Sequence, residues 1–258
     1  MNERMNSMAS NLRQAAALLL ESRHSIAFTG AGISIESGIP AFRGPNGLWA
    51  KYSPTFLDLD RFLLRPKDCW EKIREVFFDF MGKATPNPAH CALAQLEAQG
   101  LLQGVITQNI DNLHQSAGSK RVWEYHGTTR RLICLDCERT IDSGKVDLRE
   151  LPPRCPHCNG ILKPDFVFFG EAIPEHVRQM SLLQAEQADV ILVIGTTGVI
   201  MPACHIPHHA KNHGASVIEI NVAPSSYTNY ISDVFLQGPA GEVLPALLES
   251  ILPSARNQ

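Results

Sequence analysis

The sequence predicts an α/β protein built on a doubly wound parallel sheet. Apolar strand-like runs alternate with segments of helical periodicity along most of the chain, which is the pattern of strand–helix–strand units. Several runs, such as DVILVIGTT at 189–197, are apolar almost without interruption, as expected for strands covered by helices on both faces. Small or polar residues follow nearly every run, at the strand ends where Rossmann-like sheets bind their ligands.

Each element has its own local signal. The segment LRQAAALLLESR has helical apolar spacing, and Gly30 closes the strand that follows it. Gly100 ends the helix PAHCALAQLEAQG, and short apolar runs bounded by glycine or polar residues mark the later strands. We expect helices at 12–23, 88–100, 177–188, 205–214 and 241–252, and strands at 24–30, 101–107, 122–127, 189–197, 216–221 and 233–238.

Two segments interrupt this alternation and predict a smaller second domain. Residues 45–85 contain aromatic-rich helical stretches such as DCWEKIREVFFDFMGK, and residues 127–165 contain paired cysteines and little helical periodicity. We therefore expect a helical insertion at 45–85 and a zinc-ribbon insertion at 127–165 to form the small domain. The Rossmann-like domain would then consist of residues 1–44, 86–126 and 166–258.

Composition and charge argue against several classes of function. The chain has 258 residues, of which 44% are hydrophobic and 19% are charged, and its formal net charge is -3. This charge supplies no electrostatic reason to bind nucleic acid or an anionic membrane. No apolar run reaches the roughly 20 residues that cross a bilayer, and the N-terminus lacks the apolar segment of a signal peptide. We therefore expect a cytoplasmic protein that binds neither nucleic acid nor membrane directly.

The most specific local signal is a set of four cysteines. Cys134, Cys137, Cys155 and Cys158 form two CxxC pairs separated by 17 residues, a spacing typical of a tetrahedral Zn²⁺ ribbon. Four thiolates leave no open position on the metal, so its role would be structural. The alternative is a set of free buried cysteines. Zinc ribbons often bind nucleic acid, but 127–165 contains nearly equal numbers of acidic and basic residues, which is too balanced for a phosphate-binding face.

The stretch FTGAGISIESGIPAFRG at 28–44 is a strand followed by a glycine-containing turn. Such turns bring backbone N–H groups against a pyrophosphate. The full dinucleotide fingerprint would require glycine at position 35, where Ile35 stands, so a structural turn and a nucleotide site both remain open. Arg43 favours the nucleotide site, because a guanidinium there can reach phosphate or ribose; an isolated arginine is also a common surface ion-pair partner.

Polar residues follow two further strands. TQNIDNLH places Gln108, Asn109 and Asp111 where the sheet would present them to a ligand, although Asn and Asp also cap ordinary turns. His126 follows VWEY and has the residue type of a general base, with a purely structural histidine as the alternative. Neither a GxSxG elbow nor an HExxH motif occurs, so a hydrolase with a covalent nucleophile is poorly supported.

Together these segments resemble the sirtuins, NAD-dependent protein lysine deacylases, over nearly the whole chain. The resemblance is carried by GAGISIESGIPAFRG with GLW at 47–49, TQNIDNLH with AG at 117–118, HG at 126–127, both CxxC pairs, KPDFVFFGE at 163–171, GTT at 195–197 and EIN at 219–221. It implies two cofactors, NAD and Zn²⁺, and acylated lysine-containing proteins or peptides as partners.

The resemblance also implies a role for individual residues. His126 would be the catalytic base, with Asn109 and Asp111 beside it. The implied NAD contacts are Gly30, Ala31, Gly32 and Ile33 at the phosphates, Phe42, Arg43 and Trp49 in the closing loop, Gln108, Asn109, Ile110 and Asp111 at the nicotinamide and ribose, and Gly195, Thr196, Thr197, Asn221, Val222 and Ala240 at the adenosine half. The strand Val167, Phe168, Phe169, Gly170 and Glu171 would pair with the substrate backbone.

The implied reaction is acyl transfer to ADP-ribose. In this family the acyl-lysine carbonyl oxygen attacks C1′ of the nicotinamide ribose and nicotinamide leaves. His126 would then deprotonate a ribose hydroxyl, and the products would be free lysine, nicotinamide and O-acyl-ADP-ribose. Protein mono-ADP-ribosyl transfer and a non-catalytic NAD-binding or zinc interaction module are the alternatives.

Three departures from the family pattern stand out. Ala41 replaces the Asp of many members, and Thr197 replaces the usual Ser but keeps a hydroxyl, so neither change should abolish activity. The third departure concerns the acyl group. Members that remove succinyl or malonyl groups have a Tyr and an Arg three residues apart in the helix that here reads CWEKIREVFFDFMGK, without tyrosine. Ile73, Val76 and Phe77 lie near the expected positions, so we predict an apolar pocket for acetyl or a longer acyl chain.

Overall fold

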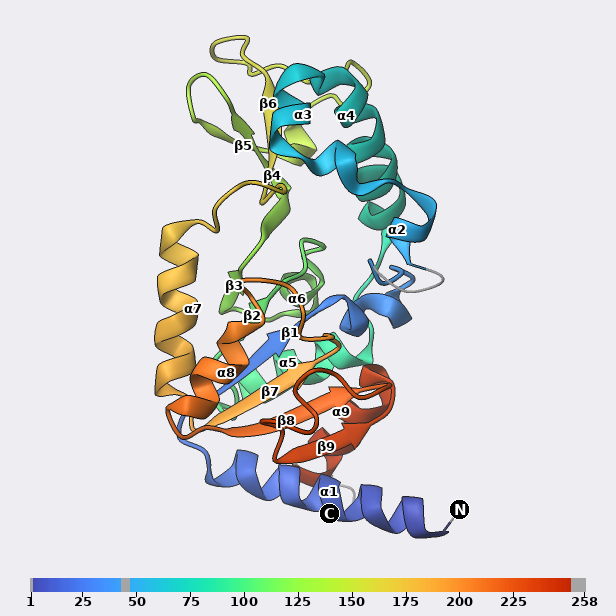
Figure 1. Ribbon diagram of the computed structural model, residues 1–258, viewed down its shortest axis with the longest axis vertical. Helices are drawn as coiled ribbons and strands as arrows, with labels where there is room; N and C mark the ends of the chain where they lie inside the picture. The colour runs from blue at the N-terminus through green and yellow to red at the C-terminus, as the bar shows by residue number, and fades with distance from the viewer. Residues whose placement is uncertain (1, 43–46, 252–258) are drawn as a thin grey trace, which may run out of the picture.

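A computed structural model describes residues 2–42 and 47–251 (Figure 1). Its large sheet has six strands in the order β3-β2-β1-β7-β8-β9, and all neighbouring strands are parallel. This is the Rossmann strand order, which reverses direction between β1 and β7. The predicted fold class is therefore confirmed. The strands are β1 (Ser25–Thr29), β2 (Val105–Thr107), β3 (Val122–Glu124), β7 (Val190–Ile194), β8 (Ser216–Asn221) and β9 (Val234–Gln237).

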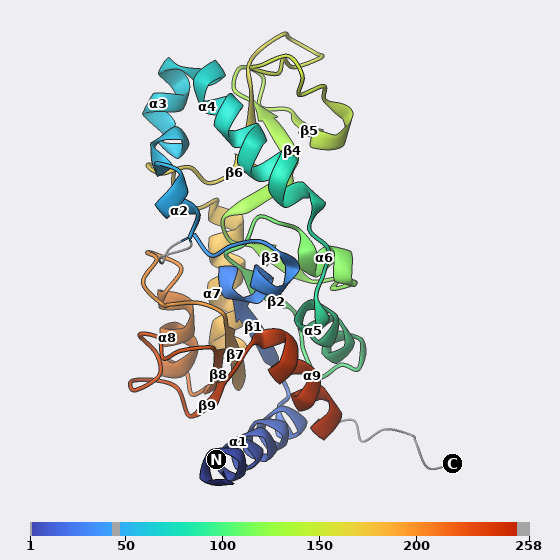
Figure 2. The same cartoon turned by 90° about the vertical axis from the view of Figure 1, so that its right-hand side faces the viewer.

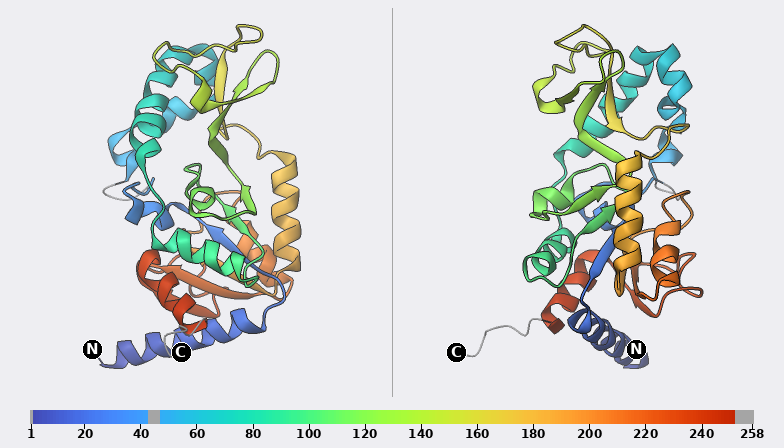
Figure 3. Two further views of the ribbon diagram at one scale, coloured as in Figure 1. Left: turned by 180° about the vertical axis from the view of Figure 1, so that it is seen from behind. Right: turned by 90° about the vertical axis from the view of Figure 1, so that its left-hand side faces the viewer.

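Helices cover both faces of this sheet (Figures 2 and 3). Leu192 and Ile218 pack into the core shared with α1, α5 and α9, whereas Ile191 and Val217 pack into the core shared with α7 and α8. Because successive strand residues point to opposite faces and both faces are buried, these strands read as continuous apolar runs. The covering helices are α1 (Asn2–Glu21), α5 (Pro88–Ala98), α7 (Glu175–Gln187), α8 (His205–Asn212) and α9 (Ala240–Ile251).

The two interrupting segments fold against each other as one small module, residues 47–83 and 127–166. The core of this module joins Phe62, Trp70 and Phe77 from the first segment to Leu132 and Leu162 from the second. Its antiparallel sheet has the order β5-β4-β6, formed by β4 (Gly127–Cys134), β5 (Thr140–Asp142) and β6 (Leu162–Phe166). Its α-helices are α2 (Leu48–Lys51), α3 (Leu59–Leu64) and α4 (Pro66–Ile73). The division of the chain into two domains at the expected boundaries stays a prediction.

Some expected elements differ from those observed. The first helix begins at Asn2, well before position 12, because residues that lack a strong apolar stripe can extend a helix already anchored by Leu19 and its neighbours. The segment after the glycine turn is a 3₁₀ helix, Ala31–Ser37, and the aromatic segment Arg74–Phe80 is a π-helix. A short helix, α6 (Leu113–Ala117), follows TQNIDN. Within the described ranges, no helix combines the length and apolar character needed to cross a membrane.

Candidate active site

The loops that follow β1 and β7 meet where the strand order reverses. The Gly32 N–H donates to the Gly195 carbonyl oxygen over 2.8 Å. A Cβ on Gly32 would lie 2.6 Å from Gly195 Cα, and a Cβ on Gly195 would lie 2.4 Å from the Ile33 nitrogen. Gly195 also has φ +60°, a region that favours glycine. Only glycine at 32 and 195 therefore allows the two loops to pack this closely.

Three backbone N–H groups of the glycine turn are bonded within the protein. The Gly30 N–H donates to the Ile194 carbonyl oxygen, the Gly32 N–H to that of Gly195 and the Ile33 N–H to that of Gly30. These three N–H groups are therefore satisfied within the protein, and Ile33 is also completely buried. The glycines at 30 and 32 permit loop-to-loop contact at the cavity wall. The role of this turn at the NAD phosphates stays a prediction.

A cavity of about 490 Å³ extends from these loops to the small module. It contains the expected catalytic residues His126 and Asn109. Of the expected cofactor and substrate residues, it is lined by Gly30, Ala31, Gly32, Phe42, Trp49, Gln108, Ile110, Val167, Phe168, Phe169, Gly170, Glu171, Gly195, Thr196, Thr197, Asn221, Val222 and Ala240. Residues spread over most of the chain thus converge on one space.

Several expected site residues lie elsewhere. Ile73 and Val76 are buried in the core of the small module, and of the three expected acyl-pocket residues only Phe77 lines the cavity. Ile73 and Val76 belong to the buried cluster that also contains Leu132 and Leu162 of the ribbon, so these two side chains stabilise the module. Ile33 and Asp111 do not line the cavity. Arg43 lies outside the described residues.

Other cavity residues were missed by the sequence reasoning. All are apolar, and they neighbour a recognised motif or lie in the loop after GTT: Ile35, Leu57, Phe166, Ile173, Ile200, Met201, Pro202 and Ile220. Ala41 and Gly238, noted from the sequence without an assigned contact, also line the cavity. Their position next to strand ends was the available signal. Which of them face the cavity depends on how the small module sits over the sheet.

Aromatic rings form the wall of the cavity on the side of the small module. The ring centroids of Phe42 and Trp49 are 5.3 Å apart. Those of Phe77 and Phe166 are 5.2 Å apart, and those of Phe166 and Phe168 are 5.3 Å apart. Such packed rings exclude water from the space beside them.

His126 is oriented as a proton acceptor. Its Nδ1 lies 2.9 Å from the Gln108 carbonyl oxygen, and because a carbonyl oxygen only accepts, Nδ1 carries the proton and Nε2 keeps its lone pair. Burial lowers the pKa of His126 below its usual range, and the hydrogen bond to Gln108 opposes this only in part. The imidazole is therefore neutral at physiological pH and able to take up a proton at Nε2.

Asn109 and Asp111 meet at Ser34, which the sequence reasoning did not single out. The Asn109 side-chain amide donates to Ser34 Oγ over 3.1 Å, and Ser34 Oγ donates to an Asp111 oxygen over 2.7 Å. The Leu113 N–H donates to the other Asp111 oxygen over 3.0 Å. Burial raises the pKa of Asp111, and its bonds from Leu113 and Ser34 oppose that shift. Asp111 thus acts on the cavity through Ser34 and Asn109.

Thr196 joins the ends of three strands. The Gln108 amide donates to Thr196 Oγ1 over 3.2 Å, and the Asn221 amide donates to the Thr196 carbonyl oxygen over 2.9 Å. Gln108 follows β2, Thr196 follows β7 and Asn221 ends β8. The polar side chains at this edge therefore hold one another in place before any ligand binds.

The segment 167–171, which the resemblance implies would pair with a substrate backbone, forms no regular strand with the rest of the described chain. β6 ends at Phe166, and beyond it only Phe169 forms a bridge, with Asp58. The Val167 N–H donates to the His126 carbonyl oxygen over 2.9 Å. After Phe166 the chain leaves β4 and crosses to residues 57–59, so it cannot continue a ladder on one neighbour.

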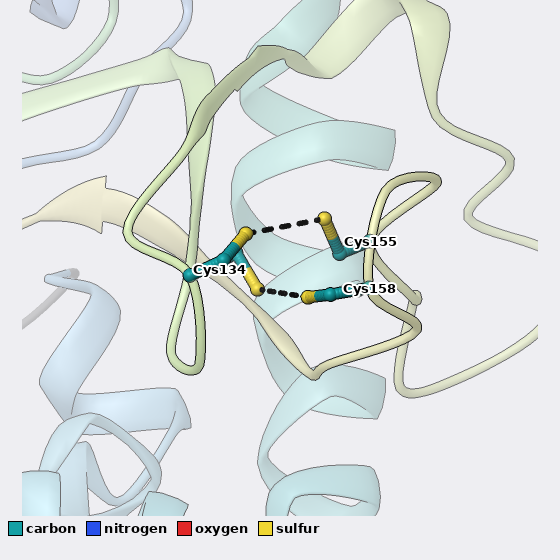
Figure 4. Close-up of side chains that lie close together, drawn as sticks. Cys134, Cys155 and Cys158 are labelled. Carbon is teal, nitrogen blue, oxygen red and sulfur yellow. Dashed lines mark hydrogen bonds between the residues drawn. The ribbon is translucent and has the colours of Figure 1, made fainter.

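The four paired cysteines converge as the spacing predicted. Their sulfur atoms lie within 4.8 Å of one another, with 3.4 Å between Cys134 and Cys158 and 3.8 Å between Cys137 and Cys155. Figure 4 shows the sulfurs of Cys134, Cys155 and Cys158 turned toward the same small space. Four thiolates bound to one tetrahedral Zn²⁺ at about 2.3 Å would be about 3.8 Å apart. The donor set and its geometry therefore fit zinc.

Comparison with known proteins agrees with this geometry. A model of the Sir2 family matches residues 30–202. The chain is 48% identical over 239 residues to NAD-dependent protein deacylase 2 of Pyrobaculum aerophilum. That alignment covers 92% of this chain and 94% of the relative. It is 47% identical over 250 residues to the NAD-dependent protein deacylase of Pyrococcus furiosus, at 93% and 98% coverage.

A solved structure of Sir2 with a p53 peptide and NAD⁺ superimposes with a TM-score of 0.84 at 36% identity, covering 92% of this chain and 97% of that one. The fold, the match over residues 30–202 and the full-length relatives agree with one another. The chain therefore belongs to the Sir2 family.

Proposed function

We propose that this protein is an NAD-dependent protein lysine deacylase. The observation that supports it most directly is His126: a half-buried, neutral imidazole on the cavity wall, with Nδ1 bonded to the Gln108 carbonyl oxygen. A base of this kind serves a reaction in which a hydroxyl must lose a proton in a space sheltered from water. Relatives with nearly full-length coverage are named NAD-dependent protein deacylases.

The cavity has two sides that suit the two substrates. The crossing loops at 30–32 and 195–197, with Asn221, provide small and polar groups for the phosphates and sugars of NAD. Bound NAD⁺ would supply an electrophilic ribose carbon and a nicotinamide leaving group. Phe42 and Trp49 would exclude water from that carbon, because both rings line the cavity and pack on each other. His126 would accept the proton of a ribose hydroxyl at Nε2.

The acylated lysine would enter from the aromatic side. Segment 167–171 borders the cavity, and the main chain there would hold the substrate backbone, with little demand on the neighbouring sequence. Phe77 and Phe166 form an apolar wall without a cationic side chain among its described lining residues. We therefore expect acetyl or longer apolar acyl groups to be removed in preference to succinyl or malonyl groups, giving free lysine, nicotinamide and O-acyl-ADP-ribose.

The cysteine cluster would bind Zn²⁺ structurally and keep the small module folded, since four sulfurs leave no position for a substrate. Metal-binding cysteine pairs are typical of a reducing compartment, so we expect a cytoplasmic protein. The formal net charge of -3 provides no attraction to nucleic acid or an anionic membrane, so we expect direct binding to neither.

The decisive experiment measures NAD cleavage by the zinc-loaded protein with a panel of acetyl-, butyryl-, myristoyl- and succinyl-lysine peptides. We expect nicotinamide release only when an acyl peptide is present, and near-complete loss of turnover in His126→Ala. His176→Ala, which removes an exposed imidazole from α7, is the matched control and should keep full activity. No cleavage with any peptide would contradict the proposal. Mass spectrometry that found an ADP-ribosylated protein and no O-acyl-ADP-ribose would favour the transferase alternative.

A further inference from the structure

We propose that Glu186, His209 and His213 form a second metal site, for a divalent transition-metal ion, at the contact between α7 and α8. The two helices lie side by side (Figure 1) and share a buried core that includes Ala185 and Ala210. Glu186 lies in the last turn of α7, His209 lies in the last turn of α8, and His213 caps the C-terminus of α8. One ligand atom of each residue lies within 4.8 Å of the other two. Neither helix contributes to the cysteine cluster.

The two imidazoles are paired on one face of the α8 end. They are four residues apart, which places them one above the other along a helix, and their ring centroids are 4.3 Å apart with 49° between the ring planes. A metal ion binds imidazole nitrogen at about 2.0–2.1 Å. Small side-chain rotations would therefore bring both nitrogens and the Glu186 carboxylate onto one ion.

Hydrogen bonding already prepares His213 as a ligand. His213 Nδ1 lies 2.8 Å from the His209 carbonyl oxygen, and that oxygen only accepts, so Nδ1 carries the proton and Nε2 keeps a free lone pair. A bond of this kind from the second ring nitrogen to a backbone carbonyl is the usual way in which a metal-binding histidine is oriented.

The surroundings of His209 favour a metal site over a chance grouping of surface side chains. Its Nε2 atom is buried and has no hydrogen-bond partner within the part of the chain that the structure describes, although Glu186 is close by. A buried ring nitrogen without a partner is unfavourable, and an ion between His209 and Glu186 would provide one. The negative end of the α8 dipole also favours a cation at this end of the helix.

The ligand types indicate which ions would bind. Two imidazole nitrogens and one carboxylate oxygen suit Zn²⁺, Ni²⁺, Co²⁺ or Cu²⁺, whereas Ca²⁺ and Mg²⁺ prefer oxygen alone. Such an ion would join α7 to α8, which follows the cavity residues Ile200, Met201 and Pro202 along the chain. The site would thus clamp the helix that adjoins one wall of the cavity.

The test titrates Ni²⁺ into the full-length protein whose cysteine cluster is loaded with Zn²⁺, by calorimetry, with a dye to detect any Zn²⁺ released. We expect one further ion per chain without Zn²⁺ release. Loss of a ligand in His213→Ala or Glu186→Gln should weaken Ni²⁺ binding at least about 10-fold, since even outer partners of a metal site matter this much. His205→Ala removes an exposed imidazole of the same helix outside the cluster and should leave binding unchanged.

Thermal unfolding gives an independent readout. Ni²⁺ should raise the Tm of the unmodified protein and of His205→Ala, because an ion that binds only the folded state stabilises it, but not the Tm of His213→Ala or Glu186→Gln. Glu186 is exposed, so its variant should fold even where His213→Ala does not. The proposal is wrong if no further ion binds, if Ni²⁺ uptake matches Zn²⁺ release, or if both ligand variants bind as the unmodified protein does.

Discussion

Lys163 Nζ lies 2.9 Å from Glu171 Oε2, and this ion pair holds the segment that borders the cavity. Lys163 is only 4% exposed. Its ammonium group also donates to the carbonyl oxygens of Pro164 over 3.1 Å and Phe166 over 2.8 Å, and it stands 4.2 Å from the centre of the Phe168 ring. Glu171 Oε2 in turn accepts from the Phe168 N–H over 2.6 Å. The chain from 163 to 171 is therefore wrapped around one buried ammonium.

Replacing this ammonium should loosen the segment. Lys163→Met would leave the Glu171 carboxylate and two carbonyl oxygens without their donor, and we expect a loss of about 2–3 kcal/mol in the free energy of unfolding. This is below the roughly 3–5 kcal/mol typical when one partner of a buried pair is removed, because the Glu171 side chain is 24% exposed. Urea unfolding checks the stability, and a rise in the KM for the acyl peptide larger than the rise for NAD checks the role of the segment. Lys145→Met, at an exposed lysine of the same module, is the control; equal effects of the two variants would refute the assignment.

His126 should determine the acid limb of the pH–rate profile. Burial lowers the pKa of His126 below the usual 6.5, so the imidazole stays neutral to lower pH than a free histidine would. We expect kcat/KM to be level around pH 7 and to fall only below pH 6.5, as protonation removes the acceptor at Nε2. The measurement is kcat/KM for an acetyl peptide between pH 5 and pH 8. A decline centred above pH 7 would mean that another group, or a charged His126, limits the reaction.

Two buried histidines, His90 and His114, should make the folded state sensitive to acid. The rings of His90 and His114 are 4.9 Å apart, and both are almost fully buried. Burial lowers the pKa of His90 to about 4 and holds that of His114 well below its usual range, with the nearby His90 adding to the effect on His114. The unfolded chain takes up protons near pH 6.5 that the folded chain does not, so stability is fully present above pH 6.5 and is lost as the pH falls toward 4.

The size of this loss can be measured by unfolding at each pH. Lowering the pKa of His90 from 6.5 to about 4 corresponds to about 3 kcal/mol of stability. His90→Gln should therefore flatten the dependence of the unfolding free energy on pH between 6.5 and 4, whatever its effect at pH 7. His205→Ala, at an exposed histidine, should leave that dependence unchanged. An unaltered slope in His90→Gln would show that other groups cause the acid sensitivity.

The crossing loops permit a matched pair of glycine substitutions. Gly195 and Gly214 both have positive φ, but an added Cβ would lie 2.4 Å from Ile33 N at Gly195 and would meet nothing within 4 Å at Gly214. Gly214→Ala should lower the free energy of unfolding by about 1–2 kcal/mol, because alanine disfavours the left-handed conformation. Gly195→Ala should lower it by clearly more and should also weaken NAD binding, because the loops after β1 and β7 must separate. Calorimetry with NAD and thermal unfolding test this; NAD affinity unchanged in Gly195→Ala would mean that the loop contact does not shape the site.

Local patterns in the sequence predicted much of this protein correctly. Continuous apolar runs predicted strands buried on both faces, because covering both faces removes the polar alternation that a half-exposed strand shows. The two CxxC pairs predicted the sulfur cluster, since the ligand residues of a ribbon are close in sequence. His126, Asn109 and Gln108 were found because the carboxyl ends of parallel strands meet at one edge of the sheet.

Contacts between distant segments decided the rest. Ile73 and Val76 proved to be core residues while Phe77 reached the cavity, and Gly32 is required by its contact with Gly195. The buried ammonium of Lys163 and the approach of Glu186 to His209 likewise had no local signature. Apolar periodicity and residue spacing indicate the secondary structure of a short segment and the ligands that lie close together in it. Which side chains face a shared space depends on how elements far apart in sequence pack together, and only the tertiary structure contains that information.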